Sequence, residues 1–163
     1  MTGLEQRVKP EILNDAKAEL PTLLGTGQWY GAKIFAIPEV HRVYRPWRNG
    51  FIFLHRIYES RKRSSFHRHH GNMWVDVKEG EYEMHLARES DKMPTAYASM
   101  SVKAGDWYFM GQRDWHRIQP KTRETRSVVI VQDWVPPTIL NVNGEWMTTR
   151  ELQEHLDIFR AYF

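Results

Sequence analysis

Hydrophobic residues near the start of the chain recur at the spacing of a helix. In KPEILNDAKAELPTLLGTG, the apolar residues Ile12, Leu13, Ala16, Leu20 and Leu23 follow roughly one face, and Pro21 interrupts the run. A proline inside a helix removes a backbone hydrogen bond. The pattern therefore predicts one or two short N-terminal helices within residues 10–25.

The end of the chain has the pattern of a capped amphipathic helix. Thr148 is followed three residues later by Glu151, which is a capping-box spacing. Four apolar residues then share one stripe: Leu152, Leu156, Phe159 and Phe163. We expect a C-terminal helix over 148–162 whose apolar stripe covers a sheet or, alternatively, meets a second subunit.

Between these flanks, from about residue 28 to 147, the pattern changes to short runs of aromatic and β-branched residues separated by turn residues, which predicts strands. About ten strands are available. The clearest runs are FIFLHRIY (51–58), SSFHRH (64–69), MWVDVK (73–78), EYEMHLA (81–87), AYASMSV (96–102), DWYFM (106–110), HRIQ (116–119) and RSVVIVQDW (126–134), with a hairpin in 139–147 around Asn143 and Gly144. In EYEMHLA, His85 alternates with Glu81 and Glu83, so we expect a surface histidine.

Length and composition limit the possibilities further. A chain of 163 residues with 41% hydrophobic residues can bury one good core, so we expect a single domain over 1–163 with no membrane span. The absence of cysteine excludes disulfides, thiolate metal ligands and a cysteine nucleophile. The N-terminus has no signal-peptide pattern, and a cytoplasmic location is the expectation. The net charge of +3 is small, so the basic run at 61–70 indicates a solvated face rather than a nucleic-acid site.

The histidines of SSFHRH have the spacing of metal ligands. If the segment is extended, the side chains of His67 and His69 point the same way and can reach one ion. His70 then faces the other way, unless a one-residue bulge exchanges its role with that of His69. His116, at the start of a later strand, is the best third ligand. Three neutral imidazoles suit divalent Fe, Zn, Ni or Cu, and Mn is a further alternative.

These motifs resemble those of the cupins, which carry an HxH motif, a strand ending in glycine, and a later glycine, strand, loop and histidine. His67, His69 and Gly80 match the first motif, and Gly105 and His116 match the second at the same spacing. The resemblance spans roughly residues 51–136. It implies an all-β chain, a cupin-type jelly-roll β-barrel with a metal-binding mouth, flanked here by the N-terminal and C-terminal helices.

The chain departs from the cupin pattern at several positions. Met73 stands where the family has a glutamate ligand, and Asp76 faces away from it on an alternating strand. In the second motif, Gly111, Arg113 and Pro120 replace the usual proline, glycine and asparagine. The sequence therefore offers three histidines and no carboxylate ligand.

A site of three histidines is similar to that of the thiol dioxygenases, a cupin subclass that binds Fe(II). That resemblance implies a mononuclear non-haem iron enzyme in which an arginine, here Arg42 or Arg45, binds the anionic group of a small substrate. Trp134 stands where those enzymes have an active-site tyrosine.

Two alternatives remain open. YRPWRNGF resembles a segment of the type II mannose-6-phosphate isomerases, which implies a metal-dependent sugar or sugar-phosphate isomerase or epimerase with phosphate-binding cations from the set Arg45, Arg48, Arg56 and Arg61. The other alternative is a cupin that binds a small molecule without catalysis. Cupins commonly pair, so a homodimer is the expected assembly.

Overall fold

The computed structural model describes residues 8–69, 71–88, 95–133 and 143–163. Helix α1 (Glu11–Gly25) precedes ten described strands, and helix α2 (Thr149–Arg160) follows them. The strands are β1 (Tyr30–Ile34), β2 (Val40–Trp47), β3 (Gly50–Tyr58), β4 (Asn72–Glu79), β5 (Glu81–Arg88), β6 (Thr95–Lys103), β7 (Trp107–Met110), β8 (Trp115–Pro120), β9 (Glu124–Gln132) and β10 (Gly144–Trp146).

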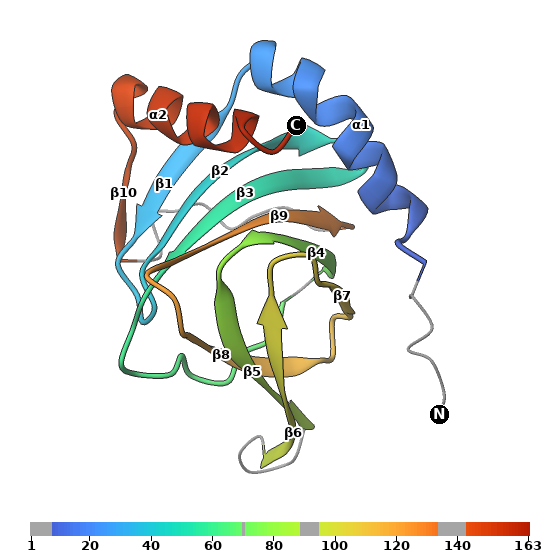
Figure 1. The fold of residues 1–163 in the computed structure, drawn as a ribbon, viewed down its shortest axis with the longest axis vertical. Coiled ribbons are helices and arrows are strands. Elements are labelled where there is room, and N and C mark those ends of the chain that lie inside the picture. The colour runs from blue at the N-terminus through green and yellow to red at the C-terminus, as the bar shows by residue number, and fades with distance from the viewer. Residues whose placement is uncertain (1–7, 70, 89–94, 134–142) are drawn as a thin grey trace.

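The strands form two antiparallel sheets, and both helices lie on the outer face of the larger one (Figure 1). The large sheet has seven strands in the order β10-β1-β2-β3-β9-β4-β7, and the small sheet has the order β6-β5-β8. The expected all-β jelly-roll class is therefore confirmed. Neither described helix is long and apolar enough to cross a membrane.

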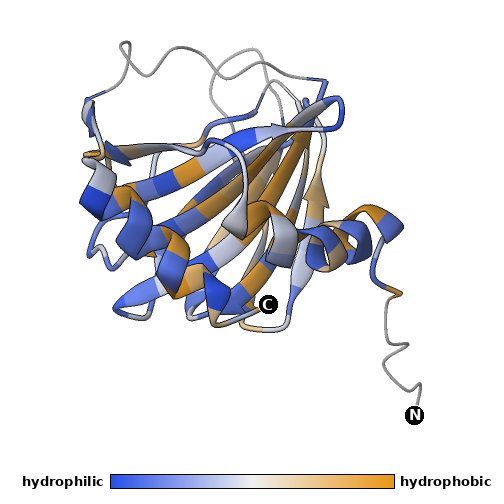
Figure 2. Cartoon of the chain, turned by 90° about the horizontal axis from the view of Figure 1, so that it is seen from above, coloured by the Kyte–Doolittle hydropathy of each residue, from blue (hydrophilic) through white to orange (hydrophobic). Residues whose placement is uncertain are grey.

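The large sheet separates two hydrophobic cores. On its outer face, Leu13 and Leu20 of α1 and Phe159 of α2 pack against Ile52 and Ile130. On its inner face, the two sheets enclose a second cluster that includes Phe53, Val129 and Tyr82. Burial on both faces explains why β3 and β9 read as nearly continuous apolar runs. Figure 2 shows these hydrophobic strand segments together with the mixed surfaces of the helices.

The N-terminal segment forms one helix rather than two. Pro21 lies inside α1, and the helix continues past it to Gly25. Leu13, Ala16 and Leu20 are buried against the large sheet. Packing of an amphipathic face contributes more to helix stability than local propensity does, so this contact can offset the cost of the proline.

Three strand predictions differ from the structure. Strands β1 and β2 were not anticipated, because β2 carries polar residues on both faces and shows no alternation. The predicted strand 64–69 is instead an irregular segment with a single bridge between His67 and His116. Of the predicted hairpin in 139–147, the first part lies outside the described residues, and Gly144–Trp146 pairs with β1.

The C-terminal helix follows its prediction closely. The side chain of Thr148 caps α2 by accepting a hydrogen bond from the backbone N–H of Glu151 at 3.2 Å. Leu156 and Phe159 are buried in the outer core, so the apolar stripe covers the sheet.

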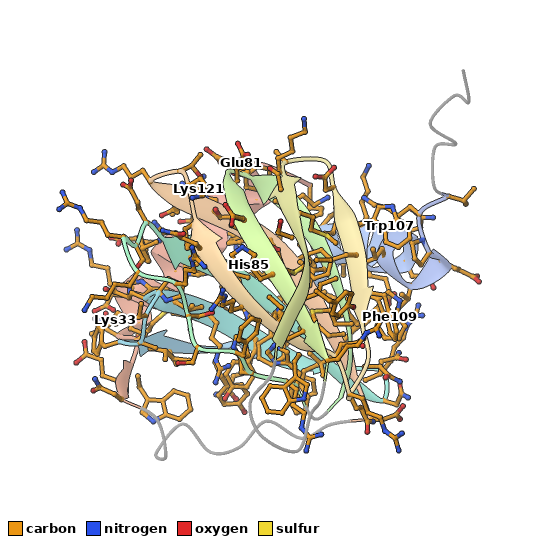
Figure 3. The ribbon with its side chains drawn as sticks, turned by 90° about the horizontal axis from the view of Figure 1, so that it is seen from below. Lys33, Glu81, His85, Trp107, Phe109 and Lys121 are labelled. Atoms are coloured by element: carbon orange, nitrogen blue, oxygen red, sulfur yellow. The ribbon has the colours of Figure 1, made fainter. Side chains whose placement is uncertain are left out.

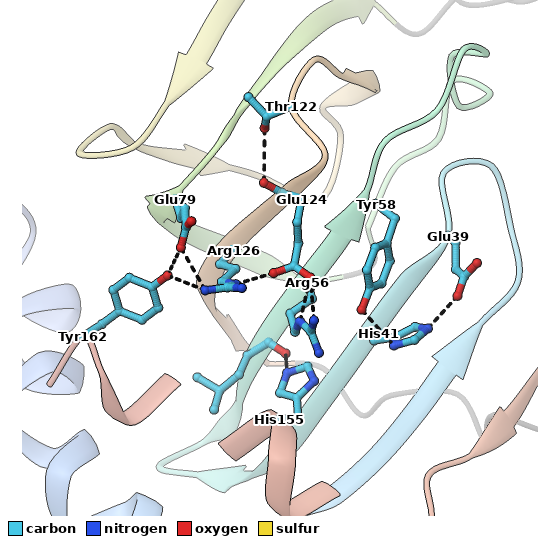
Figure 4. A network of polar contacts seen from close by, with 11 residues as sticks. Glu39, His41, Arg56, Tyr58, Glu79, Thr122, Glu124, Arg126, His155 and Tyr162 are labelled. Carbon is cyan, nitrogen blue, oxygen red and sulfur yellow. Dashed lines mark hydrogen bonds and ion pairs between the residues drawn. The ribbon is translucent and has the colours of Figure 1, made fainter. Parts of the chain in front are cut away.

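Hydrogen bonds and ion pairs connect the residues that follow α2 to the large sheet (Figure 4). Arg126 of β9 donates to Tyr162 at 3.0 Å and to Glu79 of β4 at 2.9 Å. Arg126 also pairs with Glu124, and Arg56 of β3 binds the same carboxylate at 3.0 Å. The network joins three neighbouring strands to the C-terminal segment.

The cap of α2 can be tested by mutation. We expect Thr148→Ala to lower the free energy of unfolding by about 1 kcal/mol, because the N–H of Glu151 loses its acceptor. Chemical denaturation measures the loss. Thr149→Ala, one position along and also exposed, is the matched control and should cost less than about half as much. Equal losses in the two variants would contradict the capping role.

His155 should make stability depend on pH. Its Nε2 donates to the carbonyl of Leu54 at 2.9 Å, and burial lowers the pKa of this histidine to about 3. Between about pH 6.5 and 3 an unfolded chain therefore binds a proton that folded His155 does not, so stability falls as the pH falls. One such proton contributes about 1.4 kcal/mol per pH unit to the slope.

Replacement of His155 by glutamine retains an N–H donor but removes the titrating group. We expect His155→Gln to reduce the slope of unfolding free energy against pH by about 1.4 kcal/mol per unit below pH 6. Urea denaturation between pH 7 and 4 provides the measurement. Leu156→Ala should lower stability at every pH and keep the wild-type slope. A wild-type slope in His155→Gln would show that another group causes the loss of stability at low pH.

Candidate metal centre

Three histidines from two separate segments meet inside the barrel. His67 and His69 lie on the irregular segment before β4, and His116 lies on β8. One ligand atom from each ring falls within 4.8 Å of the others. The bridge that joins the backbones of His67 and His116, with N–H···O distances of 2.9 Å in both directions, holds the two segments together at this point.

The spacing of the ring nitrogens fits a shared ion. The Nε2 atoms of His69 and His116 are 3.0 Å apart. Two nitrogens bound to one ion at about 2.0–2.1 Å, with an angle between about 90° and 109°, lie roughly 2.9–3.4 Å apart. The observed pair falls in this range.

Hydrogen bonding and burial prepare these rings to act as ligands. Nδ1 of His67 donates to the carbonyl of Ser65 at 2.9 Å, which leaves Nε2 with its lone pair. His116 is only 4% exposed, and burial together with the neighbouring His67 and His69 lowers its pKa well below the usual range. The ring of His116 is therefore neutral near pH 7, which is the form that binds metal ions.

The histidines line a cavity of about 180 Å³ between the two sheets. Its walls are mostly apolar, with Ile57, Val75 and Val129 from the large sheet and Ile118 from the small one. The described residues that line it include neither aspartate nor glutamate. The cavity is smaller than the roughly 300–1,000 Å³ typical of sites for drug-sized ligands, so it suits a small molecule.

A row of polar residues crosses the inner face of the large sheet within this cavity. Arg42 of β2 pairs with His55 of β3, and His55 pairs with Ser127 of β9. Directly paired residues in antiparallel strands present their side chains on the same face. The register therefore places one cation and one imidazole side by side in the apolar cavity.

Arg42 is a partly buried cation without a described anionic partner. Its Nε makes no hydrogen bond to the described residues, and its guanidinium lies 5.7 Å from the centroid of the Phe53 ring. Burial lowers the pKa of Arg42, although an arginine remains charged at neutral pH. A partly desolvated charge of this kind would gain from an anion in the cavity.

His55, which the sequence did not single out, is the neutral neighbour of Arg42. Burial and then the charge of Arg42 lower the pKa of His55 to about 3. Its buried Nε2 has no hydrogen-bond partner among the described residues. A polar residue between Phe53 and Ile57 on the otherwise apolar inward face of the strand was the available signal for His55.

The structure does not bring Arg45 to the cavity. Residues 42 and 45 point to opposite faces of β2 because side chains alternate along a strand. Arg45 donates to the carbonyls of Leu23 and Thr26 at 3.1 and 2.6 Å, at the end of α1. Its guanidinium also lies 5.4 Å from the centroid of the Trp29 ring. Arg45 therefore connects β2 to the end of α1 and lies away from the cavity.

The other residues named from the sequence are placed as follows. Met73 lines the cavity where cupins have a glutamate, and Asp76 lies outside it, paired with Lys9 and Lys78. His85 corrects the expectation of a surface histidine. It is only 8% exposed because Glu83 and Arg117 pack against its ring. Figure 3 shows the place of His85 on the small sheet. His70 and Trp134 lie outside the described residues.

The fold has similar solved structures, although no family model and no curated protein sequence matches the chain. The structure of KdgF from Halomonas sp. has 10% identity and a TM-score of 0.50, with 67% of this chain and 96% of that chain covered. A cupin superfamily protein from Desulfitobacterium hafniense has 14% identity and a TM-score of 0.43, with 58% and 78% covered.

Hydroxypropylphosphonic acid epoxidase from S. wedmorenis has 15% identity and a TM-score of 0.43, with 56% of this chain covered. The aligned region spans 50% of the length of that enzyme. Identities this low compare folds and not activities. With its two antiparallel sheets and its inward-facing histidines, the chain has a cupin-type jelly-roll fold, and its likeness to the KdgF structure concerns that fold alone.

Proposed function

We propose that the protein is a metal-dependent enzyme of the mononuclear non-haem iron dioxygenase type that acts on a small anionic molecule. In this proposal His67, His69 and His116 hold a divalent ion, with Fe(II) as the first candidate and Zn(II), Ni(II) or Mn(II) as alternatives. The observation that carries the proposal is the meeting of three imidazole nitrogens in a small cavity that also contains Arg42.

Arg42 binds the anionic group of the substrate in this proposal. It is the cation of the described cavity lining, and its Nε has no partner among the described residues. An ion pair formed away from water is stronger than one at the surface. The guanidinium thereby orients the substrate relative to the three histidines.

Fe(II) held by these histidines would supply the redox chemistry of dioxygen. The protein supplies neutral ligands, since no described carboxylate reaches the cavity and Met73 occupies the position of the family glutamate. The apolar walls from β3, β4 and β9 exclude bulk water from the substrate.

The sugar-phosphate isomerase is less well supported. Its expected cations Arg48 and Arg56 bind carboxylates elsewhere, in α1 and in Glu124, and Arg45 binds backbone carbonyls. Proton transfer at neutral pH also requires a base with a pKa near 7. His55, a ring of the cavity apart from the three proposed ligands, has its pKa lowered to about 3.

The partner of the site in this proposal is a small molecule and not a nucleic acid. The basic segment at 61–69 packs in part against the barrel, since the guanidinium of Arg68 lies 5.5 Å from the ring centroid of Trp115. A homodimer and a cytoplasmic location stay predictions.

The first test concerns the metal. We expect protein purified without a histidine tag and reconstituted with Fe(II) or Zn(II) to hold about one equivalent, and His67→Ala and His116→Ala to lose most of it, because each removes one of three ligands. Elemental analysis after gel filtration gives the stoichiometry. His85→Ala, a histidine on the other face of the small sheet, is the control and should retain the ion. Full retention in the His67 and His116 variants would eliminate the centre.

The second test concerns Arg42. We expect Arg42→Met to weaken the binding of small carboxylates by at least about tenfold, since it removes a buried charge-assisted contact. Calorimetry on the metal-loaded protein measures binding. Arg45→Met, three residues away but on the other face of β2, should leave the affinity within about twofold.

Oxygen consumption separates catalysis from binding alone. We expect the Fe(II) protein to consume dioxygen with a panel of small thiols and organic acids. Turnover of phosphosugars without dioxygen would support the isomerase instead. Carboxylate binding without either reaction would support the non-catalytic cupin.

A further inference from the structure

Two tyrosines, the buried Tyr82 and the partly buried Tyr108, form a hydroxyl pair in the wall of the cavity. Tyr82 is on β5 in the small sheet, and Tyr108 is on β7 at the edge of the large sheet. Their hydroxyl oxygens are 2.5 Å apart. Both residues line the cavity that contains the three histidines. The pair is therefore a second polar feature of this cavity, apart from Arg42 and the proposed metal ligands.

The pair carries one hydroxyl proton more than it uses. Burial raises the pKa of Tyr82 well above its usual value and raises that of Tyr108 to about 12, so both phenols are protonated near neutral pH. One O–H donates to the other oxygen. Among the described residues, each of these hydroxyls has one hydrogen-bond partner, which is the other hydroxyl. The second O–H therefore has no acceptor there.

A buried donor without an acceptor is costly. Leaving such a hydroxyl unsatisfied costs roughly 1–3 kcal/mol, and buried polar groups are nearly always paired. Because both tyrosines border the cavity, its contents are the available acceptor. The wall therefore presents a neutral hydrogen-bond donor, which suits an oxygen of a ligand and not an ammonium group.

The donor and Arg42 lie on opposite sides of the cavity floor. Arg42 is on β2 and Tyr108 is on β7, and strands β3, β9 and β4 lie between them in the sheet. Those intervening strands contribute His55 and Ser127 in register with Arg42, and Val129 and Val75 in register with Tyr108. The order along the inner face is thus the Arg42 cation, the polar pair His55 and Ser127, the apolar pair Val129 and Val75, and the hydroxyl donor.

We propose that the Tyr82–Tyr108 pair donates a hydrogen bond to an oxygen of the substrate at the end remote from Arg42, so that the substrate is a short aliphatic acid with a second oxygen function. The acid group pairs with Arg42, the carbon chain extends over Val129 and Val75, and the distal hydroxyl or carbonyl oxygen accepts from the tyrosine pair. This inference rests on the proposed role of Arg42 and of the metal centre.

The test compares acids that differ in one hydroxyl. Zn(II)-loaded protein is titrated by calorimetry with propanoate, butanoate and pentanoate and with the corresponding ω-hydroxy acids. We expect the hydroxyl to increase affinity about five- to tenfold at the chain length that spans the cavity, which is the effect of one neutral hydrogen bond. A hydroxyl that gives no gain at any length, or a series in which no acid binds, would overturn the inference.

The double variant Tyr82→Phe/Tyr108→Phe identifies the donor. It removes both hydroxyls while keeping the rings, a change that is close to neutral for folding because no unpaired partner remains. We expect the affinity ratio of hydroxy acid to plain acid to fall to about one, with the plain acid unaffected. Tyr44→Phe removes a hydroxyl from the same face of the large sheet outside the cavity lining, and it should keep the wild-type ratio.

Single variants keep the test decisive if the double variant fails to fold. The variant that lacks the hydroxyl contacting the ligand should lose the ratio, and the other should keep it. Wild-type ratios in both would refute the role of the pair. Failure of the proposed function has a different signature, namely no zinc uptake, or plain-acid binding that is unchanged in Arg42→Met.

Discussion

The pairing of β3 with β9 is the constraint on which the site depends. Nine consecutive residue pairs, from Gly50 with Gln132 to Tyr58 with Glu124, fix the register of the central strands. Because side chains alternate, that register sends Ile52 and Ile130 to the helices and His55 and Ser127 to the cavity. A slip of one residue would exchange the outer core with the cavity floor. The buried helices α1 and α2 thus specify the site indirectly, since they stabilise one face of these strands.

Burial in the cavity favours the uncharged forms of its histidine and tyrosine side chains. Burial keeps the ring of His116 and the ring of His55 neutral and both tyrosines protonated. Arg42 is the one arginine or lysine among the described lining residues. The cavity therefore combines neutral donors and acceptors with one cation, and an anion gains the most from entering it.

The sequence predicted the parts of the protein that carry a local signal. The capping pattern at Thr148 and Glu151 and the continuous apolar run of β9 each appear within a few residues. Strand β2 carried no such signal, since Arg42 faces a cavity and His41 faces a charged network, so both of its faces are polar. The assignment of Arg42 or Arg45 could not be resolved without knowing that β2 is a strand. The Tyr82–Tyr108 pair joins two sheets, and sequence spacing contains no information about such a contact.

The histidines are supported by unequal scaffolds. His116 belongs to a strand with a full ladder to β5, whereas His67 and His69 lie on a connecting arm that is joined to β8 at Ser64 and His67. His116 is thus part of the barrel wall, whereas His67 and His69 lie on the connection that precedes β4. In the proposed metal centre, the imidazole donors then decide which class of divalent ion can bind. The ion that occupies the site follows from the supply of such ions, since affinities of nitrogen ligands for divalent metals follow a common order.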